Sequence, residues 1–326
     1  MDNVRGGLSP VRGPALAAER VAFARPARAP ERRPFWRLPR FLTAEHPLPW
    51  LLPVTTMLLV FGLYPLGYSI WLSLHQWNRF TRAFLFSGSL QWETAYADPR
   101  MWNAVAITFI YTFVCLAVQL VLGLLIALLL DTDRKGYGIL RGLMTLPLVV
   151  PPAVTGLMFL LMLDGQFGVL TNAAIGIGIL ERTAPLLGTP STALAGVMLA
   201  DIWQWTPFMV LIFMAGLRAL PKEPYEAAAI DGATSFQMFR RLTLPMLGKV
   251  IAVALLIRGI DLFRVYDYIY VMTGGGPGTT TEAMSFYAGR IFTVGNFPYA
   301  ATLSLIILAL LIVVANVFIR VFKVRF

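Results

Sequence analysis

The chain has 326 residues, of which 57% are hydrophobic and only 13% are charged, and its mean hydropathy is +0.69. In soluble domains about a quarter of the residues are charged, so this composition excludes a soluble globular protein and predicts an integral membrane protein. In a membrane protein the formal net charge of +10 does not indicate nucleic-acid binding. The distribution of its basic residues instead predicts which loops face the cytoplasm.

Residues 1–47 are rich in arginine, proline and alanine and show no apolar periodicity. Such a segment cannot bury enough apolar surface to fold, so we expect a disordered basic tail followed by a membrane domain over residues 48–326. No apolar run lies near Met1, which argues against a cleaved secretory signal and favours a tail on the inner side. An arginine-rich transit peptide has a similar composition and is the alternative.

Six stretches contain enough apolar residues to cross a hydrocarbon core of about 30 Å, which takes roughly 20 helical residues each. We therefore expect an all-α polytopic protein with spans at about 49–74, 102–130, 139–163, 192–217, 248–272 and 300–322. Lysine and arginine concentrate in the tail, in the connections after the second and fourth spans, and at the C-terminal end. By the positive-inside rule both termini and the connection after the fourth span are predicted to be cytoplasmic.

Residue types that hold metals or nucleotides are scarce. The single cysteine, Cys115, lies inside an apolar run, and the two histidines, His46 and His75, are each solitary near the end of a span. We therefore expect no disulfide and no metal site. The sequence contains no G-x-x-x-x-G-K-[ST] motif, so we expect that this chain does not itself bind and hydrolyse ATP and holds no cofactor.

The expected fourth span carries a polar and aromatic face. Asp201, Gln204, Trp205 and Phe208 follow the spacing i, i+3, i+4, i+7, and Pro207 interrupts the backbone hydrogen bonds beside them. A carboxylate, an amide and flat rings suit a sugar, whose hydroxyls need oriented partners and whose C–H faces stack on aromatic planes. Polar contacts that only join neighbouring helices are an equally open interpretation.

The expected fifth span carries charges of alternating sign at every third position, namely Arg258, Asp261, Arg264 and Asp267. Charges inside a membrane face the interior of a bundle, where they are paired or solvated. One interpretation is an internal ladder of ion pairs, Arg258 with Asp261 and Arg264 with Asp267. The other is a polar wall of a translocation path, which the nearby Tyr266, Tyr268 and Tyr270 would support.

A polar segment, PKEPYEAAAIDGATSFQMFRRLTLPML, lies between the fourth and fifth spans. Pro224 suits the first turn of a helix, and Gly232 supplies the left-handed residue that ends one. Thr234 or Ser235 is then placed to cap a second helix, which we expect to end at Pro245. The segment therefore predicts a helix-turn-helix connection.

This segment resembles the signature loop of ATP-binding-cassette (ABC) importer permeases, the EAA loop, through Glu226-Ala227-Ala228, then Gly232, then Leu242-x-Leu244-Pro245 after nine residues. The resemblance implies the fold of a type I importer permease, with a cytoplasmic loop over residues 218–247 whose coupling helices dock into a separate ATPase subunit. The residues so implied in coupling are Tyr225, Glu226, Ala227, Ala228, Asp231, Gly232, Phe236, Phe239, Arg240, Leu244 and Pro245.

Residues 258–277, RGIDLFRVYDYIYVMTGGGP, and the polar face of the fourth span resemble the sugar-type permeases, which include those for maltose, trehalose and glycerol phosphate. The resemblance implies a substrate site at mid-membrane that includes Asp201, Gln204, Trp205, Phe208 and Arg264. The interpretation of the fifth span as a polar wall adds Arg258, Asp261 and Tyr268 to the candidate substrate residues. The maltose permease has uncharged amides in place of Asp201 and Arg264, eight spans and a large outer insertion, so the identity of the sugar stays open.

The function implied is that of a permease subunit, not an enzyme, that moves a sugar or glycoside across a bacterial inner membrane by alternating access. The implied partners are a second, similar permease, two ATPase subunits that bind ATP and magnesium, and an extracytoplasmic solute-binding protein, all around a lipid bilayer and without nucleic acid. The alternatives are a permease for a non-sugar solute such as glycerol phosphate or a polyamine, and an ion-coupled secondary transporter.

Overall fold

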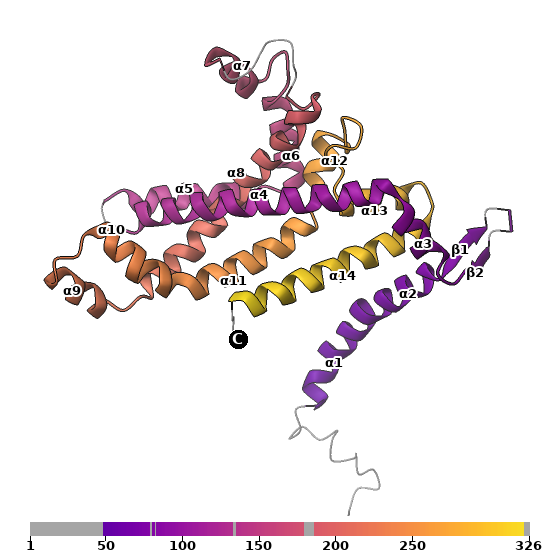
Figure 1. The fold of residues 1–326 in the computed structure, drawn as a ribbon, viewed down its shortest axis with the longest axis horizontal. Coiled ribbons are helices and arrows are strands. Elements are labelled where there is room, and N and C mark those ends of the chain that lie inside the picture. The colour runs from indigo at the N-terminus through magenta and orange to yellow at the C-terminus, as the bar shows by residue number, and fades with distance from the viewer. Residues whose placement is uncertain (1–47, 79, 82, 133–134, 179–185, 323–326) are drawn as a thin grey trace, which may run out of the picture. The chain divides into compact units, whose positions relative to one another are not determined.

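The computed structural model describes residues 48–78, 80–81, 83–132, 135–178 and 186–322, and the predicted basic tail lies outside them. The chain divides into two units, residues 1–58 and residues 59–326. The described part of the first unit is helix α1, Leu48–Leu58, which contains Pro53. The second unit holds all other elements (Figure 1).

The second unit begins with a π-helical turn, η2 (Leu59–Leu63), and helix α2 (Tyr64–Ser73). A two-stranded antiparallel hairpin follows, β1 (His75–Asn78) and β2 (Ala83–Phe86), with His75 opposite Phe86. The Asn78 side-chain oxygen accepts hydrogen bonds from the backbone N–H groups of Phe80 and Thr81 and thereby shapes the turn. The fold is mostly helical, but this hairpin departs from the all-α prediction.

Four helical stretches in the described residues are long and apolar enough to cross a membrane: Trp50–Ser73, α4 (Pro99–Leu130), α8 (Pro190–Arg218) and α14 (Phe297–Phe322). Helices α5 (Tyr137–Val149) and α6 (Pro152–Met162) pass the same test only together, and they meet at an angle of 97°. The third expected span is thus a broken one. Its break falls at Pro151, which the helix cannot accommodate in its interior.

The fifth expected span is shorter than predicted. Helix α11 runs from Leu244 to Phe263, the chain leaves the helix at Arg264, and the short helix α12 (Asp267–Met272) starts afterwards. Other short helices are α3 (Leu90–Ala97), α7 (Val169–Gly176) and α13 (Met284–Thr293). Residues 248–272 are therefore two helices joined by a turn, and not the single predicted span.

Buried side chains from six helices form a central apolar cluster. It includes Tyr111 of α4, Phe159 of α6, Val197 of α8, Leu262 of α11 and Ile269 of α12, and it reaches Phe286 of α13. Helices α4 and α8 approach closely at Gly123, where an added Cβ atom would lie 2.7 Å from Met209 Cβ. Small residues at helix contacts are typical of membrane proteins, because they let backbones come close.

This contact gives a first prediction. Gly123→Ala should lower the thermal midpoint of the purified protein in detergent, because overpacking of this kind costs about 1–3 kcal/mol. The control is Gly142→Ala in α5, where a Cβ meets no atom within 4 Å. There alanine should leave the midpoint unchanged or raise it, since alanine favours a helix over glycine. Equal midpoints for the two variants would contradict the close contact.

Candidate functional site

The charges of the fourth and fifth expected spans meet in a buried triad. Asp201 of α8 and Arg258 of α11 are each only 2% exposed and form an ion pair. Gln119 of α4 donates to Asp201 Oδ1 at 2.8 Å and accepts from Arg258 Nε at 3.0 Å. Each charge thus has an opposite charge and an amide, which is what buried ions in a membrane protein require. The triad joins three helices.

The predicted ladder of ion pairs along the fifth span is wrong. Arg258 pairs with Asp201 on another helix, and Arg264 pairs with Asp261 at 2.9 Å. The cause is the end of α11 at Phe263, which takes Asp267 onto the separate helix α12. Arg264 and Asp267 therefore do not lie on the same face of one helix, although they are three residues apart in sequence.

A second set of polar contacts extends from the triad. The Arg258 guanidinium lies 4.7 Å from the centre of the Trp205 ring, and Trp205 Nε1 donates to the Tyr268 hydroxyl at 3.1 Å. That hydroxyl donates to Gln204 Oε1 at 2.6 Å, and Gln204 Nε2 donates to the carbonyl of Val150 at 2.6 Å. Each donor and acceptor in this set is bonded to another part of the chain. The contacts therefore match the interpretation in which the polar residues of the fourth span join neighbouring helices.

The structure divides the eight predicted substrate residues into two groups. One group is the network just described, formed by Asp201, Gln204, Trp205, Arg258 and Tyr268, with half-buried Phe208 packed edge-on against Trp205 at 6.0 Å between ring centres. The other group is the pair of Asp261 and Arg264, whose side chains are 34% and 65% exposed. Only this pair and the half-buried rings offer unburied surface to a solute.

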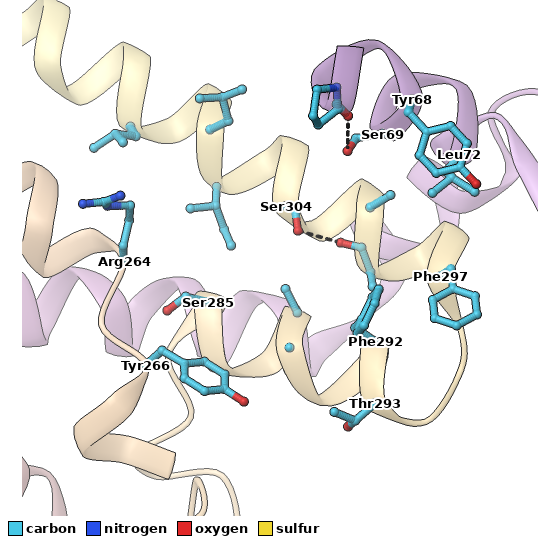
Figure 2. A pocket seen from close by; sticks show the side chains of 18 of the residues that line it. Tyr68, Ser69, Leu72, Arg264, Tyr266, Ser285, Phe292, Thr293, Phe297 and Ser304 are labelled. Carbon is cyan, nitrogen blue, oxygen red and sulfur yellow. Dashed lines mark hydrogen bonds between the residues drawn. The ribbon is translucent and has the colours of Figure 1, made fainter. Parts of the chain in front are cut away.

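Arg264 borders a cavity of about 1130 Å³. Figure 2 shows its guanidinium on one side of this space and the rings of Tyr68, Phe292 and Phe297 on the other. The lining comes from α2, the hairpin, α13 and α14, and it is apolar and aromatic apart from Arg264, Tyr266 and a few hydroxyls. An exposed ion pair beside such a cavity cannot face lipid without a large cost.

The predicted helix-turn-helix connection is present. Helix α9 (Glu223–Ile230) ends at a turn in which Gly232 has a φ of +76°, and the N–H of Ala233 bonds back to the carbonyl of Ala228. A reciprocal capping box between Thr234 and Gln237 starts helix α10 (Ser235–Met238). The positive φ explains why glycine is suited to this turn, since side chains strain that conformation.

The expected end of the second arm at Pro245 is wrong. Helix α10 continues through a π-helical turn, η3 (Phe239–Thr243), directly into α11, and Pro245 lies in the first turn of α11. The N–H of Leu244 bonds to the carbonyl of Phe239, which is five residues earlier. The wider turn accommodates a proline that has no N–H to donate. The second arm and the fifth span are thus one continuous helical segment.

The surface of this connection is more apolar than the sequence suggested. Ile230 at the end of α9 is 87% exposed and Phe236 at the start of α10 is 70% exposed. Phe236 was among the predicted coupling residues and Ile230 was missed, although an isoleucine directly before a helix stop was a usable signal. At the base of the connection, the Tyr225 hydroxyl donates to Thr243 Oγ1 at 3.0 Å and ties the two arms together.

Sequence reasoning also missed a polar cluster at the start of α4. Glu282 is fully buried and accepts two hydrogen bonds from Arg100, at 2.6 and 2.9 Å. Asp98 accepts from the hydroxyls of Tyr287 and Tyr299 at 2.6 and 2.7 Å. Burial raises the pKa of Asp98, but these hydrogen bonds outweigh burial and bring that pKa below its ordinary value. Glu282 also lies 3.7 Å from Arg290, but the partner that donates both hydrogen bonds, Arg100, lies 182 residues away in sequence, and local spacing does not reveal it.

The structure combines long apolar helices typical of a polytopic membrane protein with a buried ionic core and an exposed helical connection between α8 and α11. Residues 119–326 match the family described as binding-protein-dependent transport system inner membrane component. The chain is 35% identical over 275 residues to the trehalose/maltose transport system permease protein MalF of Thermococcus litoralis, covering 84% of this chain and 92% of that protein. The chain therefore belongs to this family of transport permeases.

A second relative and a solved structure agree with this family assignment. The trehalose transport system permease protein SugA of Mycobacterium tuberculosis is 32% identical over 286 residues, which are 86% of this chain and 90% of that protein. The crystal structure of a bacterial ABC transporter for import of the acidic polysaccharide alginate superimposes with a TM-score of 0.72 at 21% identity, over 84% of this chain and 94% of that one. This likeness shows that the fold is that of an ABC importer permease.

The buried triad gives a second prediction. Asp201→Leu should leave Arg258 buried and unpaired and should destabilise the protein by about 3–5 kcal/mol, whereas the double variant Asp201→Leu/Arg258→Met should lose much less. Thermal midpoints and membrane abundance of Asp201→Leu, Arg258→Met and the double variant measure this difference. If the double variant were as unstable as the sum of the single ones, the two charges would not be coupled.

Proposed function

We propose that this permease imports a sugar or glycoside as one of two membrane subunits of an ABC importer. The observation that carries the proposal is the identity over most of the chain to permeases named for trehalose and maltose. The aromatic lining of the cavity beside Arg264 agrees with it, because sugar rings stack on aromatic planes. A permease for glycerol phosphate or a polyamine, and an ion-coupled transporter, have no comparable support.

The proposed topology has six membrane crossings. The broken pair α5–α6 makes the third crossing, and α11 together with the turn at Arg264 makes the fifth. With this count and the distribution of lysine and arginine, both termini and residues 218–247 lie in the cytoplasm. The domain organisation is a basic tail over residues 1–47 and a membrane domain over residues 48–326.

The proposed partners follow from what this chain lacks and exposes. Two separate ATPase subunits bind ATP and magnesium in this proposal, because the sequence has no phosphate-binding motif of its own. This chain itself is proposed to hold no cofactor. The exposed apolar tip at Ile230 and Phe236 is the part that we expect to enter the ATPase surface. A second permease faces the exposed ion pair of Arg264 across the solute path, and a binding protein delivers the solute from outside, as the family description implies.

The proposed solute contacts are the exposed pair of Asp261 and Arg264 and, separately on α8, the half-buried rings of Trp205 and Phe208. An arginine paired with a carboxylate keeps the site neutral overall and still offers donors and acceptors to neighbouring hydroxyls. The remaining predicted substrate residues, Asp201, Gln204, Arg258 and Tyr268, act in this proposal by holding the wall of the path in place.

The proposed mechanism is alternating access. Closure of the ATPase subunits draws the connections of the two permeases together, and the continuous helix from α10 to α11 carries that motion into the membrane. Radiolabelled trehalose or maltose uptake by cells or vesicles tests the function. Uptake must stop when the ATPase is inactivated; uptake that survives this loss and collapses with an uncoupler would instead indicate an ion-coupled transporter.

The turn of the connection gives a third prediction. Gly232→Val strains a backbone with φ +76° and should lower uptake per ATP hydrolysed at equal membrane abundance, because the two arms lose their relative position. Gly248→Val in α11 is the matched control, since a Cβ there meets no atom within 4 Å and the backbone is helical. Wild-type coupling in the Gly232 variant would argue strongly against the proposed role.

The exposed ion pair gives a fourth prediction. Arg264→Gln should lower the maximal uptake rate at least about tenfold, which corresponds to the loss of about one hydrogen bond to a charged group. Stability should change little, because the pair is exposed and such pairs contribute about 1 kcal/mol or less. The binding protein should keep its affinity for the solute. An unchanged uptake rate would show that Arg264 does not contact the solute during transport.

A further inference from the structure

The break between α5 and α6 exposes a backbone carbonyl that the helix itself cannot satisfy. In a continuous helix the carbonyl of Val150 would accept the N–H of Val154. Here the N–H groups of Val154 and Thr155 both bond to the carbonyl of Pro151. An unpaired carbonyl at membrane depth costs several kcal/mol, so another partner is required. The side-chain amide of Gln204 supplies it, at 2.6 Å.

The orientation of the Gln204 amide is fixed by its other end. Its oxygen accepts from the Tyr268 hydroxyl at 2.6 Å, and that hydroxyl accepts in turn from Trp205 Nε1 at 3.1 Å. Gln204 is 1% exposed and Tyr268 is 4% exposed, so water does not compete for these bonds. The Tyr268 hydroxyl is therefore the junction between α8, α12 and the break.

The contacts of Trp205 and Tyr268 extend to α11, the helix that continues from the connection between α8 and α11. Trp205 lies under the Arg258 guanidinium at 4.7 Å, and Arg258 belongs to α11. The backbone is helical without interruption from Ser235 to Phe263, so a displacement of the second arm displaces Arg258 as well. A row of directional contacts thus joins α11 to Val150.

We propose that the contacts from Arg258 through Trp205 and Tyr268 to Gln204 couple the position of α11 to the angle between α5 and α6, with Gln204 and Tyr268 as positioning residues. This inference goes beyond the proposed function, because it assigns to these two residues the control of a bend in the membrane domain. The bend at Val150 is a place where the chain can change direction without breaking helical hydrogen bonds. The Gln204 bond selects one direction.

The test compares two tyrosines of the same buried cluster. Tyr268→Phe removes both hydrogen bonds of the junction and keeps the ring. Tyr111→Phe is the matched control, because the Tyr111 hydroxyl is buried and has no hydrogen-bond partner among the residues that the structure describes. The measurement is the distance distribution between spin labels on Ile139→Cys in α5 and Leu157→Cys in α6, both at exposed positions, in a Cys115→Ala background. The full chain is purified with its copurifying subunits in lipid nanodiscs.

We expect Tyr268→Phe to broaden or shift the distance distribution and Tyr111→Phe to leave it unchanged. Uptake per ATP hydrolysed should fall about tenfold in the first variant only, within the usual range of coupling between sites. If Tyr268→Phe does not assemble, Trp205→Phe removes one of the two bonds and should give a smaller broadening. An unchanged distribution in the assembled variants, or equal changes with Tyr111→Phe, overturns the inference. The spin-label result stands whatever solute is imported.

Discussion

The ion pair of Asp201 and Arg258 is the interaction on which the membrane part of this protein depends. Neither charge is tolerable in a hydrocarbon environment alone, and each is tolerable only while α8 and α11 stay in contact. Gln119 of α4 bonds to both charges, so α4 must also stay in contact with α8 and α11. The apolar surfaces of membrane helices do not specify which helices meet, because lipid is as apolar as a leucine side chain. The ionic triad supplies that specificity.

The connection between α8 and α11 depends on two departures from regular helix geometry. Gly232 reverses the chain with a positive φ, and the π-helical turn η3 lets helix continue past Pro245. Together they give an arm that turns sharply at one end and is continuous with a membrane helix at the other. A connection that ended at Pro245 would have had a flexible joint at that point, whereas the observed one has none before Phe263.

Sequence patterns predicted the elements whose cause is local. The long apolar helices α4, α8 and α14, the glycine turn and the helix-turn-helix follow from composition, spacing and capping residues. The shared face of Asp201, Gln204 and Trp205 was predicted for the same reason. Two contacts that were not predicted depend on distant partners: Arg258 bonds Asp201 across helices, and buried Glu282 bonds Arg100 from a far segment. Local spacing does not encode these contacts. Two other predictions failed for a local reason, since the third span breaks at Pro151 and a π-helical turn carries the second arm past Pro245.

The exposed Ile230 and Phe236 have a consequence for the supply of this protein in a cell. In the proposed complex the ATPase subunits cover these two side chains, so a copy made in excess of its partners would keep them exposed to water. Exposed apolar residues favour aggregation and degradation by quality-control proteases. Under this proposal, balanced synthesis of the subunits would limit the amount of permease lost in that way.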